Sequence, residues 1–474
     1  MLQDLREAGD SQVRVQAFHK TYFPPGCILY GVVFDHQPGE AKPLISIQKL
    51  TMQGSYSGLL YKHLTRIVAD GLRVVVPAFG TGQAFHTTPS KITIGEMVAN
   101  GSTLQFAPSD PSQQPLTFDI HEASLKDVGW NGPLAYRVRI HNPNPPGEIT
   151  ASGKFGAWDK GNPGRTPVSG EYAFAQADLG LYEGIAGKLS STGKFGGTLA
   201  HIDISGATDA PDFVVTSGGH PMRLTTTFSA YVDATQGNTY LKQVDGDFWK
   251  THVAALGSVA RSSNGKGKTA LIDLKLKNAR IEDLLLLFVE AKRAPMSGPV
   301  SLQAHTEIPP GDEDFLKKVK IQGSFGIADG EFSQPSTQQG VNKLSAGAQG
   351  KKNDTDPGTA LTDLSGKVNL QNGVAHFTDL SFGIPGASAS LHGTYNLINY
   401  KIDLRGQMQL DSKISNSQSG PKALLLKAVE PFFKKKKKGE IIPVRVSGTY
   451  SHPQFGLDLD DKKAQKVPPP QAPR

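Results

Sequence analysis

Apolar and polar residues alternate with a strict period of two through residues 361–458. Ile402, Leu404 and Met408 fall on one side of an extended strand, and the charged and amide residues between them fall on the other. The same alternation recurs in nearby segments, at 388–395 and 444–450. A period of two in successive segments predicts antiparallel strands with one apolar face and one solvated face.

Similar but shorter alternating segments occur through the rest of the chain, at 115–120, 224–232, 270–276, 300–304 and 319–325. Helical patterns are fewer, and we expect short helices near 59–68, 281–292, 312–318 and 421–433. The pattern therefore predicts a mainly β protein: an elongated, curved antiparallel sheet, folded like a taco around a groove, with a few short helices.

We divide the chain into three β regions and a tail. An N-terminal region, 1–160, carries the helix near 59–68, and a middle region, 161–310, carries the helix near 281–292. A C-terminal region, 311–461, includes a polar loop at 334–359 and the helix near 421–433. The proline-rich segment 462–474 is expected to be a disordered tail. The spacing S-G-x4-P-x-F occurs twice, from Ser205 and from Ser447, and we interpret it as a repeated turn that ends a structural unit.

The composition fits a turn-rich β protein, because the 474 residues include 52 glycines and 32 prolines. The formal net charge of +7 is mildly basic, which is compatible with an anionic surface as a partner. A single cysteine, Cys27, excludes an internal disulfide and a cysteine-rich zinc site. The longest clearly apolar run, 284–289, is too short to span a membrane, and residues 1–10 resemble a soluble helix more than a secretion signal.

Residues 265–269, Gly-Lys-Gly-Lys-Thr, end like a phosphate-binding loop, but position 262 is serine where that loop has glycine. They also precede a predicted strand, so we expect a hairpin turn. His305 and Glu307 alternate on one strand, and we interpret them as part of a solvated face and not as half of a metal site. We predict no catalytic residue, no cofactor and no metal.

The run Lys434, Lys435, Lys436, Lys437 and Lys438 follows the apolar pair Phe432–Phe433. One interpretation is a helix end that touches anionic lipid headgroups, in which each lysine contributes about 1 kcal/mol. The other is a solvated connection with cations at a helix C-terminus.

Several short motifs in residues 315–459 resemble the C-terminal region of AsmA-like proteins. In chain order these are Leu364-Ser365-Gly366-Lys367-Val368, Asn372-Gly373-Val374-Ala375, Leu380-Ser381-Phe382, Gly393-Thr394-Tyr395-Asn396-Leu397 and Ser447-Gly448-Thr449-Tyr450. The motifs are strand ends and turns, so they specify a fold more than an activity.

The resemblance implies a protein of the Gram-negative cell envelope, related to the AsmA, TamB and YhdP types. Such proteins have an N-terminal inner-membrane helix and a periplasmic β structure with an apolar groove, which is thought to carry phospholipid toward the outer membrane. Residues 1–10 do not contain that helix, so we expect either a start at an internal methionine or a soluble piece.

Physical reasoning leads to the same fold, because a few short helices cannot cover so many one-sided strands. An open groove filled by acyl chains is one solution, and ordinary two-sheet sandwiches are the other. We expect the groove to be lined by Phe228, Ile272, Leu274, Leu391, Ile402, Leu404, Met408, Val444 and Val446.

The expected function is non-enzymatic: binding or conducting phospholipid, or another acyl-chain lipid, between the inner and outer membranes. One alternative is a scaffold or chaperone for outer-membrane protein assembly that pairs with a sheet edge. A second is a secreted β-rich hydrolase. No nucleic acid is expected as a partner.

Overall fold

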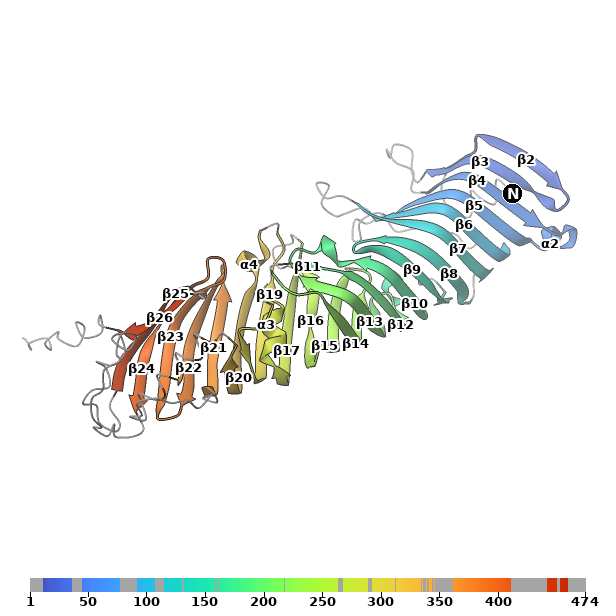
Figure 1. The fold of residues 1–474 in the computed structure, drawn as a ribbon. Coiled ribbons are helices and arrows are strands. Elements are labelled where there is room, and N and C mark those ends of the chain that lie inside the picture. The colour runs from blue at the N-terminus through green and yellow to red at the C-terminus, as the bar shows by residue number, and fades with distance from the viewer. Residues whose placement is uncertain are drawn as a thin grey trace, which may run out of the picture. The chain divides into compact units, whose positions relative to one another are not determined.

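The computed structural model shows a mainly β chain whose 26 strands form one large, open, curved sheet (Figure 1). It describes residues 12–35, 45–76, 92–106, 115–129, 132–157, 159, 162–216, 218–262, 267–288, 292–311, 313–333, 335, 338, 341–342, 345, 361–410, 441–449 and 452–458. The expected mainly β, curved sheet is confirmed, and the described strands do not form separate two-sheet sandwiches. Two compact units divide the chain: unit 1 covers 1–213 and 223–244, and unit 2 covers 214–222 and 245–474.

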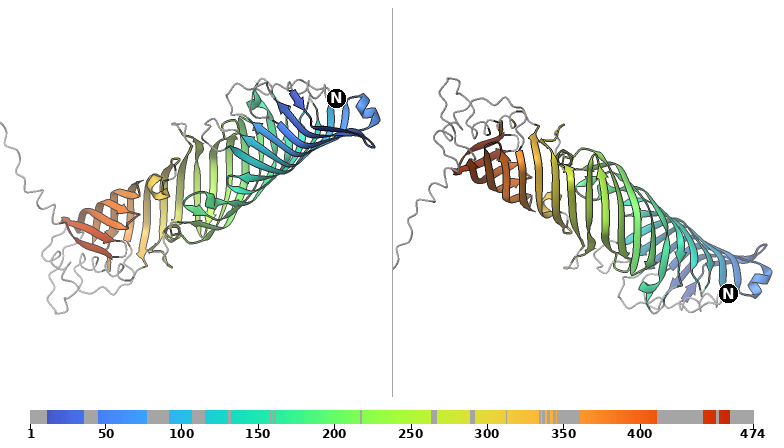
Figure 2. Two further views of the ribbon diagram at one scale, coloured as in Figure 1. Left: turned by 90° about the horizontal axis from the view of Figure 1, so that it is seen from above. Right: turned by 90° about the horizontal axis from the view of Figure 1, so that it is seen from below.

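The strands of unit 1 pair mostly with their neighbours in sequence. They are β1 (Gln12–Arg14), β2 (Ala17–Tyr22), β3 (Pro25–Asp35), β4 (Ile45–Gly54), β5 (His63–Val76), β6 (Thr93–Phe106), β7 (Leu116–Val128), β8 (Leu134–Pro143), β9 (Pro146–Phe155), β10 (Pro167–Asp178), β11 (Ile185–Ala186), β12 (Lys188–Thr198), β13 (His201–Val215), β14 (Met222–Asp233) and β15 (Asn238–Phe248). Figure 2 shows that many of these long strands bend along their length. A bent strand brings its ends toward the face on the inside of the bend.

One pairing in unit 1 departs from the antiparallel expectation: β5 and β6 run parallel, with Leu64 opposite Ile94 and Ile67 opposite Met97. Parallel neighbours need a long connection, because the chain must return to the starting end before the second strand begins. Residues 77–92 separate the two strands and are long enough for that return. Alternation of apolar residues cannot reveal such a pairing, because both directions present the same faces.

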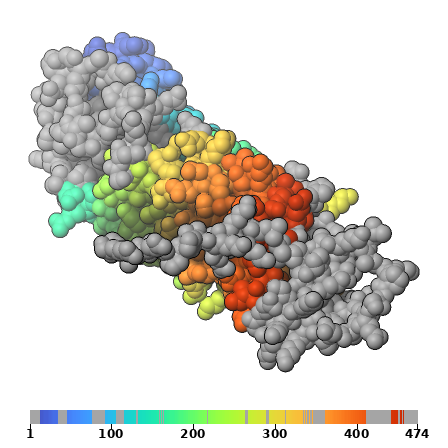
Figure 3. All heavy atoms as spheres, turned by 90° about the vertical axis from the view of Figure 1, so that its left-hand side faces the viewer, coloured from blue at the N-terminus to red at the C-terminus, as the bar shows by residue number. Residues whose placement is uncertain are grey.

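Unit 2 is antiparallel at every pairing between its described strands. Its strands are β16 (Thr251–Arg261), β17 (Lys268–Arg280), β18 (Met296–Ser297), β19 (Pro299–Ile308), β20 (Lys320–Phe332), β21 (Leu361–Gln371), β22 (Val374–Ile384), β23 (Ala387–Asn396), β24 (Lys401–Leu410), β25 (Ile441–Thr449) and β26 (His452–Leu457). The space-filling view of Figure 3 shows the later strands as adjoining bands, from yellow through orange to red. Arg261 pairs with Lys268, so the expected hairpin around 265–269 is confirmed at its two flanking strands.

The helix expected near 59–68 is wrong over most of its length. Helix α2 covers only Tyr56–Leu60, and strand β5 begins at His63. Leu64 and Ile67 are both buried although they are three positions apart in sequence, a spacing typical of a helix. A register shift between β4 and β5 at Gln53 and Gly54 explains this spacing, because a bulge changes which residues share a face.

The next two helices are shorter than expected. Helix α3 covers Ile281–Leu286 of the predicted 281–292, and helix α4 covers Phe315–Lys318 of the predicted 312–318. The helix near 421–433 and the tail 462–474 lie outside the described residues.

The polar segment 334–359, expected to be a loop, is partly helical. Pro335, Gln338, Val341, Asn342 and Ser345 are helical. Gln338 donates to the Asn342 side chain at 2.9 Å, one helical turn away, and accepts from the Phe332 backbone N–H at 2.9 Å. Val341 is buried in the core, so this segment packs against the sheet despite its polar composition. The sequence pattern missed it because the segment is rich in polar residues and glycine, a composition typical of loops.

The two copies of the S-G-x4-P-x-F spacing do not share a structure. The copy from Ser205 lies inside the long strand β13, whereas the copy from Ser447 crosses the turn between β25 and β26. The interpretation as a repeated terminal turn was therefore wrong, and a short spacing match did not fix the conformation.

Candidate functional site

The apolar side chains expected to line a groove share one face of unit 2. Cross-strand register places Leu404 of β24 between Gly393 of β23 and Val446 of β25. One step along the strands, Gly406 lies between Leu391 and Val444 in the same way. Because alternate residues of paired strands share a face, Ile402 and Met408 also belong to this surface.

The same face extends back to β17. A row of directly opposed residues begins at Ile272 and ends at Ile402, passing through Thr306, Ile321, Leu370, Ala375 and Tyr395. Leu274 begins the next row, opposite Ala304. The eight candidates of unit 2 are thus brought onto one continuous face by strands that are more than a hundred residues apart in sequence.

The remaining candidates are placed differently. Phe228 lies on β14 in unit 1, where it is half-buried. Phe432, Phe433 and the lysines 434–438 lie outside the described residues, so the two interpretations of that segment stay open.

Two buried clusters border the apolar face of unit 2. One cluster includes Leu276, Val300, Met408 and Ile442, and it is covered by Leu284 and Leu285 of α3 and by Val341. The other is centred on Val319, Leu370 and Ala375, with Phe315 of α4 packed against it. Short helices therefore cover parts of the face, each near one end of the strands.

Other apolar side chains on the same face are only half-buried. The group consists of Ile272, Leu274, Ile402, Leu404 and Val446, and the described clusters do not include them. Leu391 and Met408, in contrast, are 4% exposed each and belong to the packed interior. We call the half-buried group the trough residues, and they are the part of the candidate list that remains accessible.

Glycines lie among the trough residues at positions that would otherwise carry inward side chains. A Cβ on Gly406 would lie 2.8 Å from the Leu391 Cα, and one on Gly323 would lie 2.6 Å from the Gln303 carbonyl oxygen. Both distances are too short for any side chain, so the neighbouring strand occupies the space. Glycine inside a strand often marks such a close approach of another backbone.

In unit 1, aromatic rings lie across glycines of neighbouring strands. The Phe195 Cζ lies over Gly170, 3.1 Å from where a Cβ would be, and Tyr172 covers Gly193 in the same manner. The Tyr172 hydroxyl is hydrogen-bonded to Ser191 Oγ at 3.0 Å. The rings therefore lie flat on the sheet with their polar atom satisfied, which leaves an apolar surface.

The row from Ile272 contains one polar side chain with an unusual environment. Thr306 is 7% exposed, and its hydroxyl is the one described buried side-chain atom without a hydrogen-bond partner. In mutational series, a buried hydroxyl without a hydrogen-bond partner costs about 1–3 kcal/mol of folding stability. The alternating pattern does not reveal this environment, because threonine is common in strands.

The opposite face is polar and carries cross-strand hydrogen bonds and an ion pair. His305 Nδ1 lies 2.7 Å from Asp273 Oδ1, and Lys320 Nζ lies 3.1 Å from Glu307 Oε1. His305 and Glu307 thus have separate partners on neighbouring strands, in agreement with a solvated face. The described residues contain no cluster of metal-ligating side chains.

On this face the Arg445 Nε donates to Asp403 Oδ1 at 2.9 Å. That hydrogen bond, together with the positive charges of Arg445 and Arg405, holds the pKa of Asp403 below its ordinary value. The carboxylate is therefore ionised throughout the neutral range. Its position on the outer side keeps this charge away from the trough.

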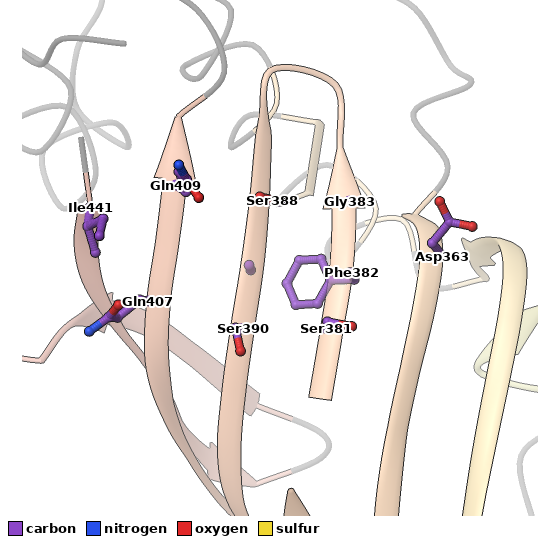
Figure 4. A pocket seen from close by; sticks show the side chains of 10 residues that line it. Asp363, Ser381, Phe382, Gly383, Ser388, Ser390, Gln407, Gln409 and Ile441 are labelled. Carbon is purple, nitrogen blue, oxygen red and sulfur yellow. The ribbon is translucent and has the colours of Figure 1, made fainter. Parts of the chain in front are cut away.

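A shallow pocket over β21–β25 offers no evident catalytic chemistry (Figure 4). Its described lining consists largely of Ser381, Ser388, Ser390, Gln407 and Gln409, with Asp363 at one side. No histidine, lysine or cysteine is among the lining residues that the structure describes, and Asp363 is the one carboxylate among them.

Searches of family models, curated proteins and solved structures find no match to this chain. The helices of the described residues include none that is long and apolar enough to cross a bilayer.

Proposed function

We propose that this chain binds lipid acyl chains along the trough residues and holds them without catalysis. The observation that carries the proposal is the continuous apolar face of unit 2, on which half-buried trough residues of β17 and of β24–β25 flank the packed cluster around Leu370 and Ala375. Contiguous apolar surface of this kind is uncommon on soluble proteins unless something apolar covers it. Affinity would be spread over many contacts and not concentrated in one site.

The dimensions support an acyl chain as the occupant. The row from Ile272 to Ile402 crosses β17, β19, β20, β21, β22, β23 and β24 through successive pairings. Six steps of about 4.8 Å span about 29 Å, which exceeds the length of one acyl chain, because a chain occupies about half of the roughly 30 Å hydrocarbon thickness of a bilayer. A lipid lying along the row could therefore keep both of its chains on the apolar surface.

The motifs shared with AsmA-like proteins support a setting in the cell envelope. In that setting the trough would bind or conduct phospholipid in the periplasm, between the inner and outer membranes. The glycines of the trough favour conduction, because a smooth floor with few protruding side chains offers few deep traps to a sliding chain.

The test is lipid mass spectrometry of protein purified without harsh detergent. We expect phospholipid to co-purify, and the double variant Leu404→Asp/Val446→Asp to carry at least about tenfold less, because charges on the apolar face oppose burial of acyl chains. The matched control is Gln407→Asp/Gln409→Asp, which adds the same charge to the other face of β24. The milder pair Leu404→Gln/Val446→Thr covers the case in which the aspartates disturb folding.

Wild-type protein without lipid, or equal lipid content in all variants, would contradict the proposal. Crosslinking to outer-membrane protein precursors in the same preparations would instead favour the scaffold alternative.

A further inference from the structure

A group of large apolar side chains is exposed where α2 meets the turn between β2 and β3 (Figure 1). Phe23 is 90% exposed, Tyr61 is 84%, Leu60 is 83% and Tyr22 is 69%. Tyr56, exposed by 59%, completes the group. We call these five residues the aromatic tip. Exposure of adjacent large apolar side chains to water is unfavourable in free energy, and contact with a second apolar phase removes that penalty.

The aromatic tip is built as a unit by contacts between its two segments. The Tyr56 hydroxyl donates to the Tyr22 carbonyl oxygen at 2.8 Å, and the Phe23 and Tyr56 rings meet edge to face at 6.3 Å. Ser55 Oγ accepts from the Gly58 N–H at 2.9 Å, which caps α2. The exposure is therefore held by hydrogen bonds and ring packing and is not the result of a frayed end.

The charged residues of the two segments that form the aromatic tip are all basic. Segments 15–26 and 53–66, which form the tip and the strand ends beside it, contain no aspartate or glutamate. They contain Lys20, Lys62 and Arg66, of which Arg66 pairs with Glu96 of β6 at 3.2 Å. Aromatic residues next to lysines are typical of protein surfaces at the interface between bilayer and water. The lysines favour anionic headgroups, which attract nearby basic residues.

We propose that the aromatic tip docks on a lipid bilayer that contains anionic headgroups. A bilayer fits better than a protein partner because Phe23, Leu60 and Tyr61 each protrude with more than four-fifths of their surface free. Side chains at the centre of protein interfaces are usually flanked by a ring of half-buried neighbours, whereas protruding rings insert between headgroups. The inference concerns unit 1 alone and does not depend on lipid binding by the trough.

Co-sedimentation with vesicles tests the proposal. The full chain is mixed with vesicles of phosphatidylcholine and phosphatidylglycerol, or of phosphatidylcholine alone, and we expect stronger binding to the first. Phe23→Ser/Leu60→Ser/Tyr61→Ser should lower the affinity at least about tenfold, since one large apolar side chain is worth about a decade or more in partitioning. The control Leu181→Ser/Leu256→Ser/Phe288→Ser removes side chains that are also half or more exposed, at 52%, 50% and 55%, and should bind like the wild type.

A triple variant that binds vesicles as tightly as the wild type would overturn the proposal. Lipid that co-purifies with each variant is measured in parallel. If the triple variant loses vesicle binding but keeps its co-purified lipid, the loss is assigned to the aromatic tip. If it loses co-purified lipid but still binds vesicles like the wild type, the aromatic tip is not the membrane contact, and the lipid effect belongs to the trough.

A second readout reports insertion directly. The tryptophan fluorescence added by Phe23→Trp should be quenched by vesicles that contain brominated phosphatidylcholine. The fluorescence added by the control Leu256→Trp should not be quenched. Absence of quenching at Phe23→Trp in vesicle-bound protein would overturn the proposal. Light scattering gives a further test. If the wild type is an oligomer that does not bind vesicles, and the triple variant is a monomer, the proposal is overturned, because the aromatic tip would then be an interface between copies of this chain.

Discussion

Gly393 and Leu404 face each other across β23 and β24, and a Cβ on Gly393 would lie 2.9 Å from the Leu404 Cα. The same Cβ would overlap with the carbonyl oxygen of Asp403. Gly393 also has φ of +145°, a backbone conformation that side chains strongly disfavour. The close approach of the β23 and β24 backbones at this point therefore depends on the missing side chain of Gly393.

Gly393→Ala should therefore be strongly destabilising, by about 2 kcal/mol or more, because it combines a steric overlap with an unfavourable φ. Chemical denaturation followed by circular dichroism measures the change. The matched control is Gly326→Ala on the polar side of β20, where a Cβ would meet nothing within 4 Å. Similar losses for both variants would contradict the close approach at Gly393.

Thr306→Val should stabilise the lipid-free protein by about 1 kcal/mol, because it replaces a buried hydroxyl that has no partner. Thr306→Ser serves as the control, since it keeps the hydroxyl and removes the methyl group, and it should destabilise. A loss of stability in Thr306→Val would show that the hydroxyl has a partner in solution.

Asp283→Ala should cost about 2–3 kcal/mol, because Asp283 is buried and ties α3 to the sheet. Its Oδ2 accepts from the Thr251 hydroxyl at 2.9 Å and from the Lys250 N–H at 3.1 Å. Asp283→Asn retains one acceptor and should cost less. Hydrogen exchange should be faster in α3 of the alanine variant, and equal exchange would contradict the anchoring role.

Asp403→Asn should make the stability of the protein less sensitive to acid. The pKa of Asp403 is lowered in the folded state, mainly by its hydrogen bond from Arg445. Its contribution is therefore present above the ordinary aspartate pKa of about 4 and is lost as the pH falls through the lower folded-state pKa. The side chain is 45% exposed, so solvent screening limits the effect to below about 1 kcal/mol.

Denaturation curves collected between neutral pH and the acid range measure this difference. Arg445→Met should remove the same pH dependence as Asp403→Asn, because either change breaks the pair. The assignment would be contradicted if the difference in stability between the wild type and Asp403→Asn stayed constant as the pH fell below about 4, the ordinary aspartate pKa.

The period of two was sufficient to predict the strands and their faces, because each residue of a strand points to the side opposite its neighbours. For this reason Leu404 and Val446 could be placed together on one apolar face before any pairing was known. The same rule separated Asp403 and Arg405 onto the solvated side. A local rule of this kind works wherever the strand is regular.

Tertiary structure decided what local rules cannot express. The bulge beside Leu64 produced a spacing of buried residues typical of a helix. The parallel pairing of β5 and β6 depends on a long connection and not on the alternation of apolar residues. The aromatic tip was missed for a similar reason: the apolar run at 59–61 interrupts the period of two, but only packing determines whether such a run is buried or exposed.

The trough shows the same division most clearly. Sequence determined that Gly393 and Leu404 belong to the apolar face, since both occupy positions of the alternating pattern. Only the pairing of β23 with β24 decided that the glycine is obligatory and that Leu404 remains half-exposed, because both properties depend on how closely the neighbouring backbone approaches.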